Sequence, residues 1–436
     1  MRMHATVSVA TVVAASAASA QEVEYWNAKA QATYVWQAKP AFSSPYEGAH
    51  SLSGAREKSY SFTATAALGL RLGSNTEAYF DPEVALGVPL SGLVGLAGFT
   101  NGEMARTSGA NPTFYRARLF VRHVIGLGEE TEDIAPAMNQ LASKYAVRRV
   151  TLTAGNLSVM DIFDANQFNH DPRSQFLNWT LMTHGAYDFA ADARGYTWGA
   201  AIEYQAGSLA LRGGRFMQPK EPNQLALDTH IGSHFGDQIE LERRYELDSE
   251  KPGVLRLLAY RNRAVMARYD DALALAAATG ATPSLDAVRT TEQTKVGAGV
   301  NVEQTFTRDL GGFLRAMWAD GKTETYAFTE ADRSFSIGAS ARGTPWGRPT
   351  DTVGVAFASN MLSTGHRGIL EGGGLTFFLG DGRLNYAPEQ ILETYYAFAA
   401  LKGLTLSADY QRIRNPGYNA DRGPASFFAL RVHVEN

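Results

Sequence analysis

The chain has 436 residues, a formal net charge of −4 and no cysteine. The near balance of charge excludes the basic surface expected of a nucleic-acid-binding protein, and the lack of cysteine excludes stabilisation by disulfides. Hydrophobic residues make up 45% of the chain, a share that fits a soluble protein and also a transmembrane β-barrel, in which lipid-facing and lumen-facing residues alternate.

The first twenty residues have the pattern of a secretory signal peptide. Arg2 precedes an apolar stretch over residues 5–15, and Ala18-Ser19-Ala20 offers small residues at the cleavage positions. The apolar stretch is too short to cross a bilayer as a helix, and the alternative for it is a buried N-terminal helix. We predict a signal peptide over residues 1–20 and a single domain over residues 21–436.

In the remainder of the chain, many segments alternate between apolar and polar residues. Leu404, Leu406, Ala408 and Tyr410, for example, are separated by single polar residues. Such alternation is typical of strands with one buried face. We predict about sixteen strands, over residues 31–38, 59–72, 75–84, 114–126, 148–156, 197–205, 208–217, 238–247, 253–264, 294–305, 311–320, 334–342, 352–359, 391–400, 403–414 and 425–434.

The lengths of the links distinguish a membrane barrel from a soluble sandwich. Short links around residues 73–74, 206–207, 249–252, 307–309 and 402 alternate with long ones over residues 87–113, 157–196, 266–293 and 360–390. Outer-membrane barrels have short periplasmic turns and long external loops. The fold class is therefore predicted to be all-β, a transmembrane antiparallel β-barrel. The link over residues 127–147 departs from this rhythm because it is long, and a helix from Ile134 to Tyr145 is considered for it; the link at 343–350 is a milder exception.

A row of three arginines, Arg116, Arg118 and Arg122, is the sharpest candidate for a functional feature. Their even spacing predicts that they share the lumen face while Leu119 and Val121 face lipid, since an Arg at the lipid-facing midplane costs about 2–4 kcal/mol. Guanidinium groups in a lumen can donate hydrogen bonds to the hydroxyls of a passing sugar. They can equally brace the wall through salt bridges, and the two roles are compatible.

Further side chains are predicted to line the lumen with this row. They are Glu77, Tyr79 and Asp81 on the preceding strand, Arg149 on the following strand, and Glu240 and Glu242 further along the chain. A lining that mixes donors and acceptors suits neutral, hydroxyl-rich solutes. A channel for anions would be expected to have a purer basic ring.

The long link over residues 157–196 is a candidate constriction loop. It carries Asp171, Arg173, Phe176 and Trp179. In one interpretation the aromatic faces contact the apolar faces of sugars, while the charged groups hydrogen-bond to the sugar rim. In the other, the aromatic residues fix the loop to the barrel wall.

Signals for catalysis and metal binding are weak. The sequence has no G-x-S-x-G and no H-E-x-x-H motif. His230 and His234 are four residues apart in a predicted loop, and the oxygen-bearing residues of segment 161–171 do not have EF-hand spacing. We therefore predict no enzyme, no cofactor and no metal site.

Four segments resemble the carbohydrate-selective porin family of Gram-negative bacteria. They are DIFDANQFNHDPRSQFLNW (161–179), AADARGYTWG (190–199), GDGRLNYAPEQILETYY (380–396) and DYQRIRNPGYNADRGP (409–424). The resemblance implies a sixteen-stranded barrel that passes glucose and related sugars down a gradient, through a lumen narrowed by inward-folded loops. Family members usually end in an aromatic residue where this chain has Asn436, a departure that bears on recognition by the barrel insertion machinery.

The sequence thus predicts an outer-membrane porin for passive diffusion of small neutral sugars. The barrel would be surrounded by outer-membrane lipid, and a homotrimer is considered as its assembly. The alternatives are a general or weakly anion-preferring porin, an outer-membrane hydrolase with its site on the barrel wall, and a structural barrel with a plugged lumen.

Overall fold

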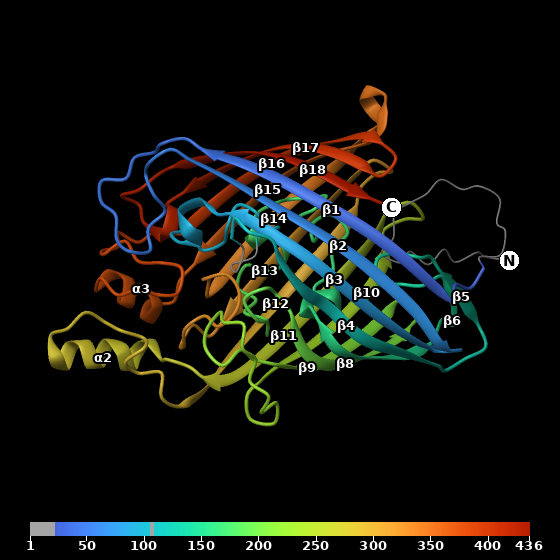
Figure 1. Cartoon of the computed structure of the whole chain (residues 1–436), viewed down its shortest axis with the longest axis horizontal. Helices are drawn as coiled ribbons and strands as arrows, with labels where there is room; N and C mark the ends of the chain where they lie inside the picture. The colour runs from blue at the N-terminus through green and yellow to red at the C-terminus, as the bar shows by residue number, and fades with distance from the viewer. Residues whose placement is uncertain (1–21, 105–108) are drawn as a thin grey trace.

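Sixteen antiparallel strands close into one barrel in the computed structural model, which describes residues 22–104 and 109–436 (Figure 1). The all-β barrel predicted from the sequence is confirmed, and so is its strand number. The predicted signal peptide, residues 1–20, lies outside the described residues. No helix in the described ranges is long and apolar enough to cross a membrane.

Each predicted strand is present. The barrel strands are β1 (Trp26–Lys39), β2 (Glu57–Gly73), β3 (Thr76–Val88), β4 (Thr113–Gly126), β7 (Arg149–Leu157), β8 (Thr197–Ala206), β9 (Leu209–Met217), β10 (Phe235–Glu246), β11 (Pro252–Val265), β12 (Glu292–Thr305), β13 (Leu310–Ala319), β14 (Arg333–Gly343), β15 (Arg348–Met361), β16 (Glu389–Leu401), β17 (Leu404–Arg414) and β18 (Ala425–Glu435). β1 pairs with β18 and closes the ring.

Helices occur mainly in the long links. They are α1 (Trp179–Met182), α2 (Tyr269–Thr279) and α3 (Thr364–Glu371), with short 3-10 turns at Leu90–Leu93, Val159–Asp161, Thr344–Trp346 and Pro416–Tyr418. The α2 and α3 helices lie together at the end of the barrel that carries the long loops (Figure 1). The milder exception at 343–350 is one of these turns, between β14 and β15.

The outer face of the barrel is apolar, as the strand alternation requires. On β17 and β18, Leu406 pairs with Val432, and Ala408 with Leu430. Leu406, Val432 and Leu430 are 41%, 39% and 56% exposed, whereas Asp409 is buried inside. A continuous band of exposed apolar side chains would be unfavourable in water and is satisfied by lipid.

The helix considered for Ile134 to Tyr145 is wrong. That link forms a small hairpin, in which β5 (Thr131–Ile134) pairs with β6 (Ser143–Ala146). Between the two strands, Asn139 has a left-handed φ of 55°. Such a conformation interrupts a right-handed helix and is tolerated by asparagine in turns. The segment can therefore reverse direction and enter the short-turn end of the barrel.

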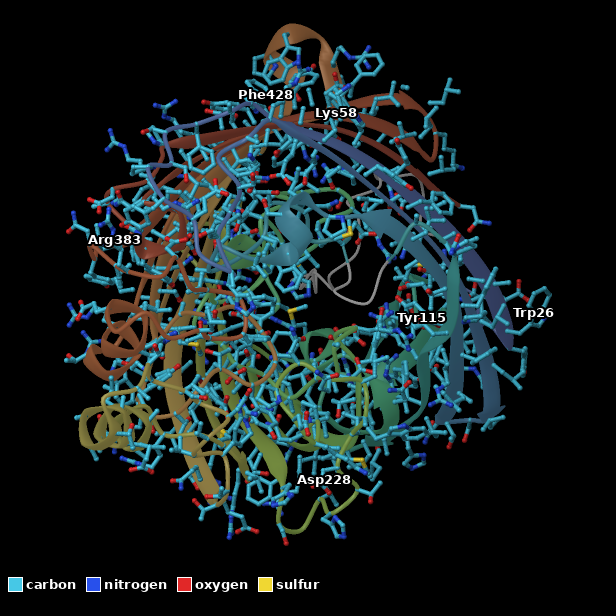
Figure 2. The ribbon with its side chains drawn as sticks, turned by 60° about the vertical axis from the view of Figure 1, so that its left-hand side comes forward. Trp26, Lys58, Tyr115, Asp228, Arg383 and Phe428 are labelled. Atoms are coloured by element: carbon cyan, nitrogen blue, oxygen red, sulfur yellow. The ribbon has the colours of Figure 1, made fainter. Side chains whose placement is uncertain are left out.

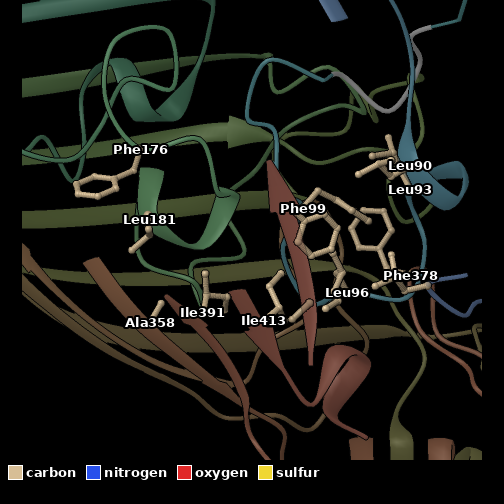
Figure 3. Packing of buried hydrophobic residues seen from close by; sticks show 14 of the residues in the cluster. Leu90, Leu93, Leu96, Phe99, Phe176, Leu181, Ala358, Phe378, Ile391 and Ile413 are labelled. Carbon is tan, nitrogen blue, oxygen red and sulfur yellow. The ribbon is translucent and has the colours of Figure 1, made fainter. Parts of the chain in front are cut away.

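The interior at the long-loop end is packed with apolar side chains. Leu96 and Phe99 from the link after β3 meet Leu181 from the link after β7, against Ile391 of β16 and Ile413 of β17 (Figure 3). All five are at most 4% exposed. Two inward-folded loops thus build a core of the kind found in soluble proteins along the β15–β18 side of the barrel.

Candidate functional site

A β-bulge in β4 decides which arginines face the lumen. Asp81 of β3 pairs with Arg118, but the next residue, Pro82, pairs with Arg116, so that Ala117 is the extra residue. An extra residue reverses the alternation beyond it. Tyr115 therefore lies on the inner face, where its hydroxyl donates to Glu83, and Figure 2 shows Tyr115 on the inner side of its strand.

The placement of Arg116 in the lumen row is accordingly wrong. Its Nε donates to Oδ1 of Asn156 at 3.2 Å, and its guanidinium carbon lies 5.0 Å from the centre of the Trp198 ring. Asn156 pairs with Leu119 and with Trp198 in the sheet, and Leu119 is an exposed residue of the outer face. Arg116 thus belongs to the outward side of the rim at the long-loop end.

Arg118 connects the barrel wall to the 158–196 loop. Its Nη1 lies 3.3 Å from Oδ2 of Asp81, and its Nε and Nη2 each donate to Asp161 at 2.7 Å. The guanidinium also lies over the Tyr196 ring, 5.4 Å from its centre. A two-pronged Arg–carboxylate pair fixes the loop in both distance and orientation.

Arg122 lies nearer the short-turn end of the barrel than Arg118 and contacts the β5–β6 hairpin. Its Nη1 donates to the carbonyl oxygen of Asn139 at 3.1 Å and lies 3.9 Å from Glu77. Glu77 accepts hydrogen bonds from Tyr79 at 2.6 Å and from Tyr145 of the hairpin at 2.5 Å. Glu77 and Tyr79 are therefore buried anchors for the hairpin.

Arg173 supplies a third guanidinium on this side of the lumen, from the loop. It lies 3.0 Å from Glu103 and 3.2 Å from Glu83. Glu83 shares the alternation of Glu77 and Asp81 on β3, and this pattern places it on the same face. Glu103 lies in an irregular loop, and no spacing indicates its partner.

Exposure separates these three arginines from the inward arginines of β11 and β13. The side chains of Arg118, Arg122 and Arg173 are 18%, 25% and 13% exposed, whereas those of Arg256 and Arg315 are 4% and 1% exposed. Near the short-turn ends of β8 and β10, Glu203 and Arg244 are also accessible, at 24% and 31%. At the level of the loop, the accessible lumen charge is thus on the β3–β4 side.

Glu240 and Glu242 lie inside the barrel but are buried. Both are within 2.9 Å of Arg212, and Glu240 accepts a hydrogen bond from the backbone N–H of Asp164 at 2.7 Å. Arg149 is placed at the short-turn end, where it pairs with Glu132 of the hairpin and donates to Gln205 at 3.0 Å. Glu240 and Arg149 therefore hold inward segments to the wall, whereas Glu242 joins arginines of neighbouring strands.

The aromatic residues of the loop fix it in place. Phe176 packs edge-on against Tyr395, with ring centres 4.9 Å apart, and Trp179 stacks on Phe328 at 5.6 Å. The indole N–H of Trp179 donates to the carbonyl of Asn101 at 3.0 Å. Asp171 caps its own turn by accepting from the backbone N–H of Arg173 at 2.9 Å. Of the two interpretations from the sequence, the geometry favours attachment for Phe176 and Trp179.

A fully buried charge cluster anchors the middle of the loop. Asp164 lies 3.0 Å from Arg315 and 3.3 Å from His184. Burial would raise the pKa of Asp164, but Arg315, His184 and hydrogen bonds from Thr183 and Asn301 lower it to about 2. Burial lowers the pKa of His184 to about 4 in spite of the attraction of Asp164. The cluster therefore holds a charged Asp164–Arg315 pair and a neutral histidine at neutral pH.

The model of the carbohydrate-selective porin, OprB family, matches residues 49–435. The chain belongs to the OprB family. Among solved structures, this porin is similar to the high-pH structure of Pseudomonas putida OprB, with a TM-score of 0.72, 16% identity and 94% of each chain covered. It is also similar to the outer-membrane channel DcaP of Acinetobacter baumannii, with a TM-score of 0.51, 8% identity and coverage of 94% of this chain and 97% of that one. No curated protein matches it.

Family membership settles the class of function and the location. The chain is an outer-membrane β-barrel porin for carbohydrates. The short turns and both ends of the barrel chain are therefore periplasmic, and the long loops are extracellular. At the level of the loop, the OprB-family porin has its accessible inward charges on the β3–β4 wall and on the loop segment facing that wall.

Proposed function

We propose that small neutral sugars diffuse through the porin along the β3–β4 wall, between Arg118, Arg122 and Arg173 and the carboxylates beside them. The observation that carries the proposal is the partial exposure of these three guanidiniums, set against the burial of the inward charges opposite. The packed core along β15–β18 leaves little room for a solute on that side.

The arrangement supports a preference for neutral, hydroxyl-rich solutes. Each guanidinium has a carboxylate within 4 Å, so donors and acceptors alternate along the wall. A sugar hydroxyl both donates and accepts, and can exchange hydrogen bonds along such a path. A solute of one charge sign would be attracted by one group and repelled by the next.

Liposome swelling tests the proposal. Proteoliposomes holding the porin should admit neutral monosaccharides and disaccharides faster than anionic or cationic solutes of the same size. Equal rates for neutral and anionic solutes would favour the general porin instead. The same preparation, incubated with lipid and glycoside substrates, should give no hydrolysis, because we propose that the solute passes chemically unchanged. Turnover that co-purifies with the folded barrel would favour the hydrolase.

A further inference from the structure

A cavity of about 660 Å³ lies at the extracellular rim, beside the proposed sugar path: its lining includes Tyr115, which bonds to Glu83, and Tyr196, over which Arg118 lies. It is formed where the extracellular ends of β4, β7, β8 and β9 meet the link between β9 and β10. Its lining includes two arginines, Arg116 and Arg194, and four apolar residues, Trp198, Met217, Leu225 and Leu227. Cationic and apolar side chains therefore line the same cavity.

The two guanidiniums are held in place but have no ion-pair partner in the described part of the chain. Arg116 is fixed by Asn156 and by the Trp198 ring. Arg194 lies over the Tyr115 ring at 4.7 Å, and its Nε is buried without a hydrogen-bond partner among the described residues. The carboxylate in the lining, Asp192, accepts from the backbone N–H groups of Arg194 and Tyr196 at 2.9 and 3.2 Å. Two ordered guanidiniums can bind an anion here, since the neighbouring Asp192 carboxylate is taken up by backbone N–H groups and forms no salt bridge with either of them.

A band of outward arginines continues from this cavity around the rim. Arg215 and Arg261 share Asp237 at 2.7 and 2.6 Å and lie over the Phe235 ring at 3.8 and 5.0 Å. In the sheet, Asp237 pairs with both arginines and alternates with the exposed Ile239 of the outer face. Charged side chains that point outward at the extracellular ends of the strands mark the boundary between the hydrocarbon core of the membrane and the lipid headgroups.

We propose that the cavity binds a phosphate group on the sugar headgroup of an outer-leaflet glycolipid. Arg116 and Arg194 would take the phosphate, while Met217 and Leu225 contact the start of an acyl chain. The exposure of Leu225 (42%) and the rim position of Arg116 favour a lipid over a soluble anion, since a soluble anion needs no apolar wall.

Native mass spectrometry of the whole purified porin tests this. The probes are a diphosphorylated glucosamine-disaccharide lipid, the same lipid without phosphates, and glucose 6-phosphate. The porin should retain the phosphorylated lipid at least about ten-fold better than the dephosphorylated one, a preference of the size that charge-assisted bonds give. Arg116→Gln with Arg194→Gln should abolish that preference, and Arg116→Lys should reduce it partly because a lysine cannot bind phosphate with two parallel donors.

Arg414→Gln is the matched control, because Arg414 is an exposed arginine at the extracellular end of β17 with no ion pair in the described part of the chain. It should leave lipid retention unchanged. An equal loss in this control would mean nonspecific surface charge and would overturn the proposal. So would equal retention of the dephosphorylated lipid, or binding of glucose 6-phosphate as tight as that of the lipid. A change in oligomeric state without any change in lipid retention would assign the cavity to contact between copies, and would also overturn it.

Discussion

Arg118 on β4 and Asp161 in the extracellular loop face each other as a two-pronged ion pair, with both N–O distances at 2.7 Å. Arg118 also lies beside Asp81, which accepts a hydrogen bond from Asn139 of the periplasmic hairpin at 2.8 Å. One short stretch of the β3–β4 wall is therefore where the segments entering from the two ends of the barrel meet. Changes here should alter passage most directly.

Truncating Arg118 to Ala should raise single-channel conductance and weaken the block of current by a bound sugar. The change removes donors and bulk together, and losing a hydrogen bond to a charged group costs roughly 1.5–3 kcal/mol. Asp81 and Asp161 would be left without their cation, so selectivity should shift toward cations in a salt gradient. Leu119→Ala on the lipid face is the control and should change neither value. Unchanged conductance and block in Arg118→Ala would mean that the row only braces the wall.

Replacing Arg315 with Met should loosen the extracellular loop. The variant leaves Asp164 charged and buried without its main partner, and breaking a buried pair in this way typically costs about 3–5 kcal/mol. The expected result is proteolytic cleavage within 158–196 while the barrel itself stays heat-modifiable. Arg308→Met, an exposed position in a periplasmic turn, should show no new cleavage. If the loop of the Arg315→Met variant resists the protease as well as the loop of the parent protein does, the anchoring role of Arg315 would be contradicted.

Acid should release the same loop in two stages. The folded pKa of His184 is lowered to about 4, below its ordinary value, so the docked loop loses stability as pH falls from about 6.5 toward 4 and the released histidine takes up a proton. Asp164 has a folded pKa lowered to about 2, so its contribution is present above about 3.8 and is lost as pH falls below that value. Hydrogen exchange of residues 176–184 across this range measures the release. His184→Gln should remove the first stage, and its persistence in that variant would assign the stage to another group.

Truncating Trp179 to Ala should weaken loop docking, by less than the roughly 3–5 kcal/mol of a fully buried aromatic because Trp179 is partly buried. Its stacking on Phe328 and its hydrogen bond to Asn101 would both be lost. Current recordings should show larger and noisier openings. Trp346→Ala, in the turn after β14, controls for loss of an exposed indole. Current noise in Trp179→Ala equal to that of the parent protein would show that other contacts suffice to hold the loop.

Replacing residues 131–146 with a tight turn should widen the periplasmic end. Arg122, Glu77 and Tyr79 would lose the hairpin groups that now cover them. We expect higher conductance with little change in the sugar block, because Arg118 keeps its extracellular partner. The amount of heat-modifiable barrel checks folding. A folded variant with unchanged conductance would place the narrow point entirely on the extracellular side.

The strands were predictable because alternation of apolar and polar residues is a local property of the sequence, and each of the sixteen barrel strands was expected from it. The Ala117 bulge was not predictable, since an extra residue is visible only against the partner strand. That single residue exchanged the faces of Tyr115 and Arg116. The hairpin was missed because its apolar spacing fits a helix, and Asn139 interrupts that helix only through its backbone angle.

The candidate site was predictable in composition but not in pairing. Residue type and strand face placed Arg118, Arg122 and Asp81 inside the barrel. Nothing local indicates that Asp161 would reach Arg118, or that Arg315 would sit against Asp164, about 150 residues earlier. These pairings depend on how the long loop folds back, which is a tertiary property. For the same reason, the sequence could not show that Glu240 is buried beneath that loop.

The extracellular loop is attached to two distant parts of the cylinder. Arg118 holds it to β4, and the carboxylate of Glu393 on β16 accepts the backbone N–H groups of Leu177 and Asn178 at 2.5 and 3.0 Å. Six strand-to-strand junctions separate β4 from β16 around the shorter arc. The loop therefore works as a transverse strut: it resists flattening of the cylinder when lateral pressure in the bilayer changes. Cross-sectional stiffness in this porin should accordingly come from inside the tube as well as from its hydrogen-bonded wall.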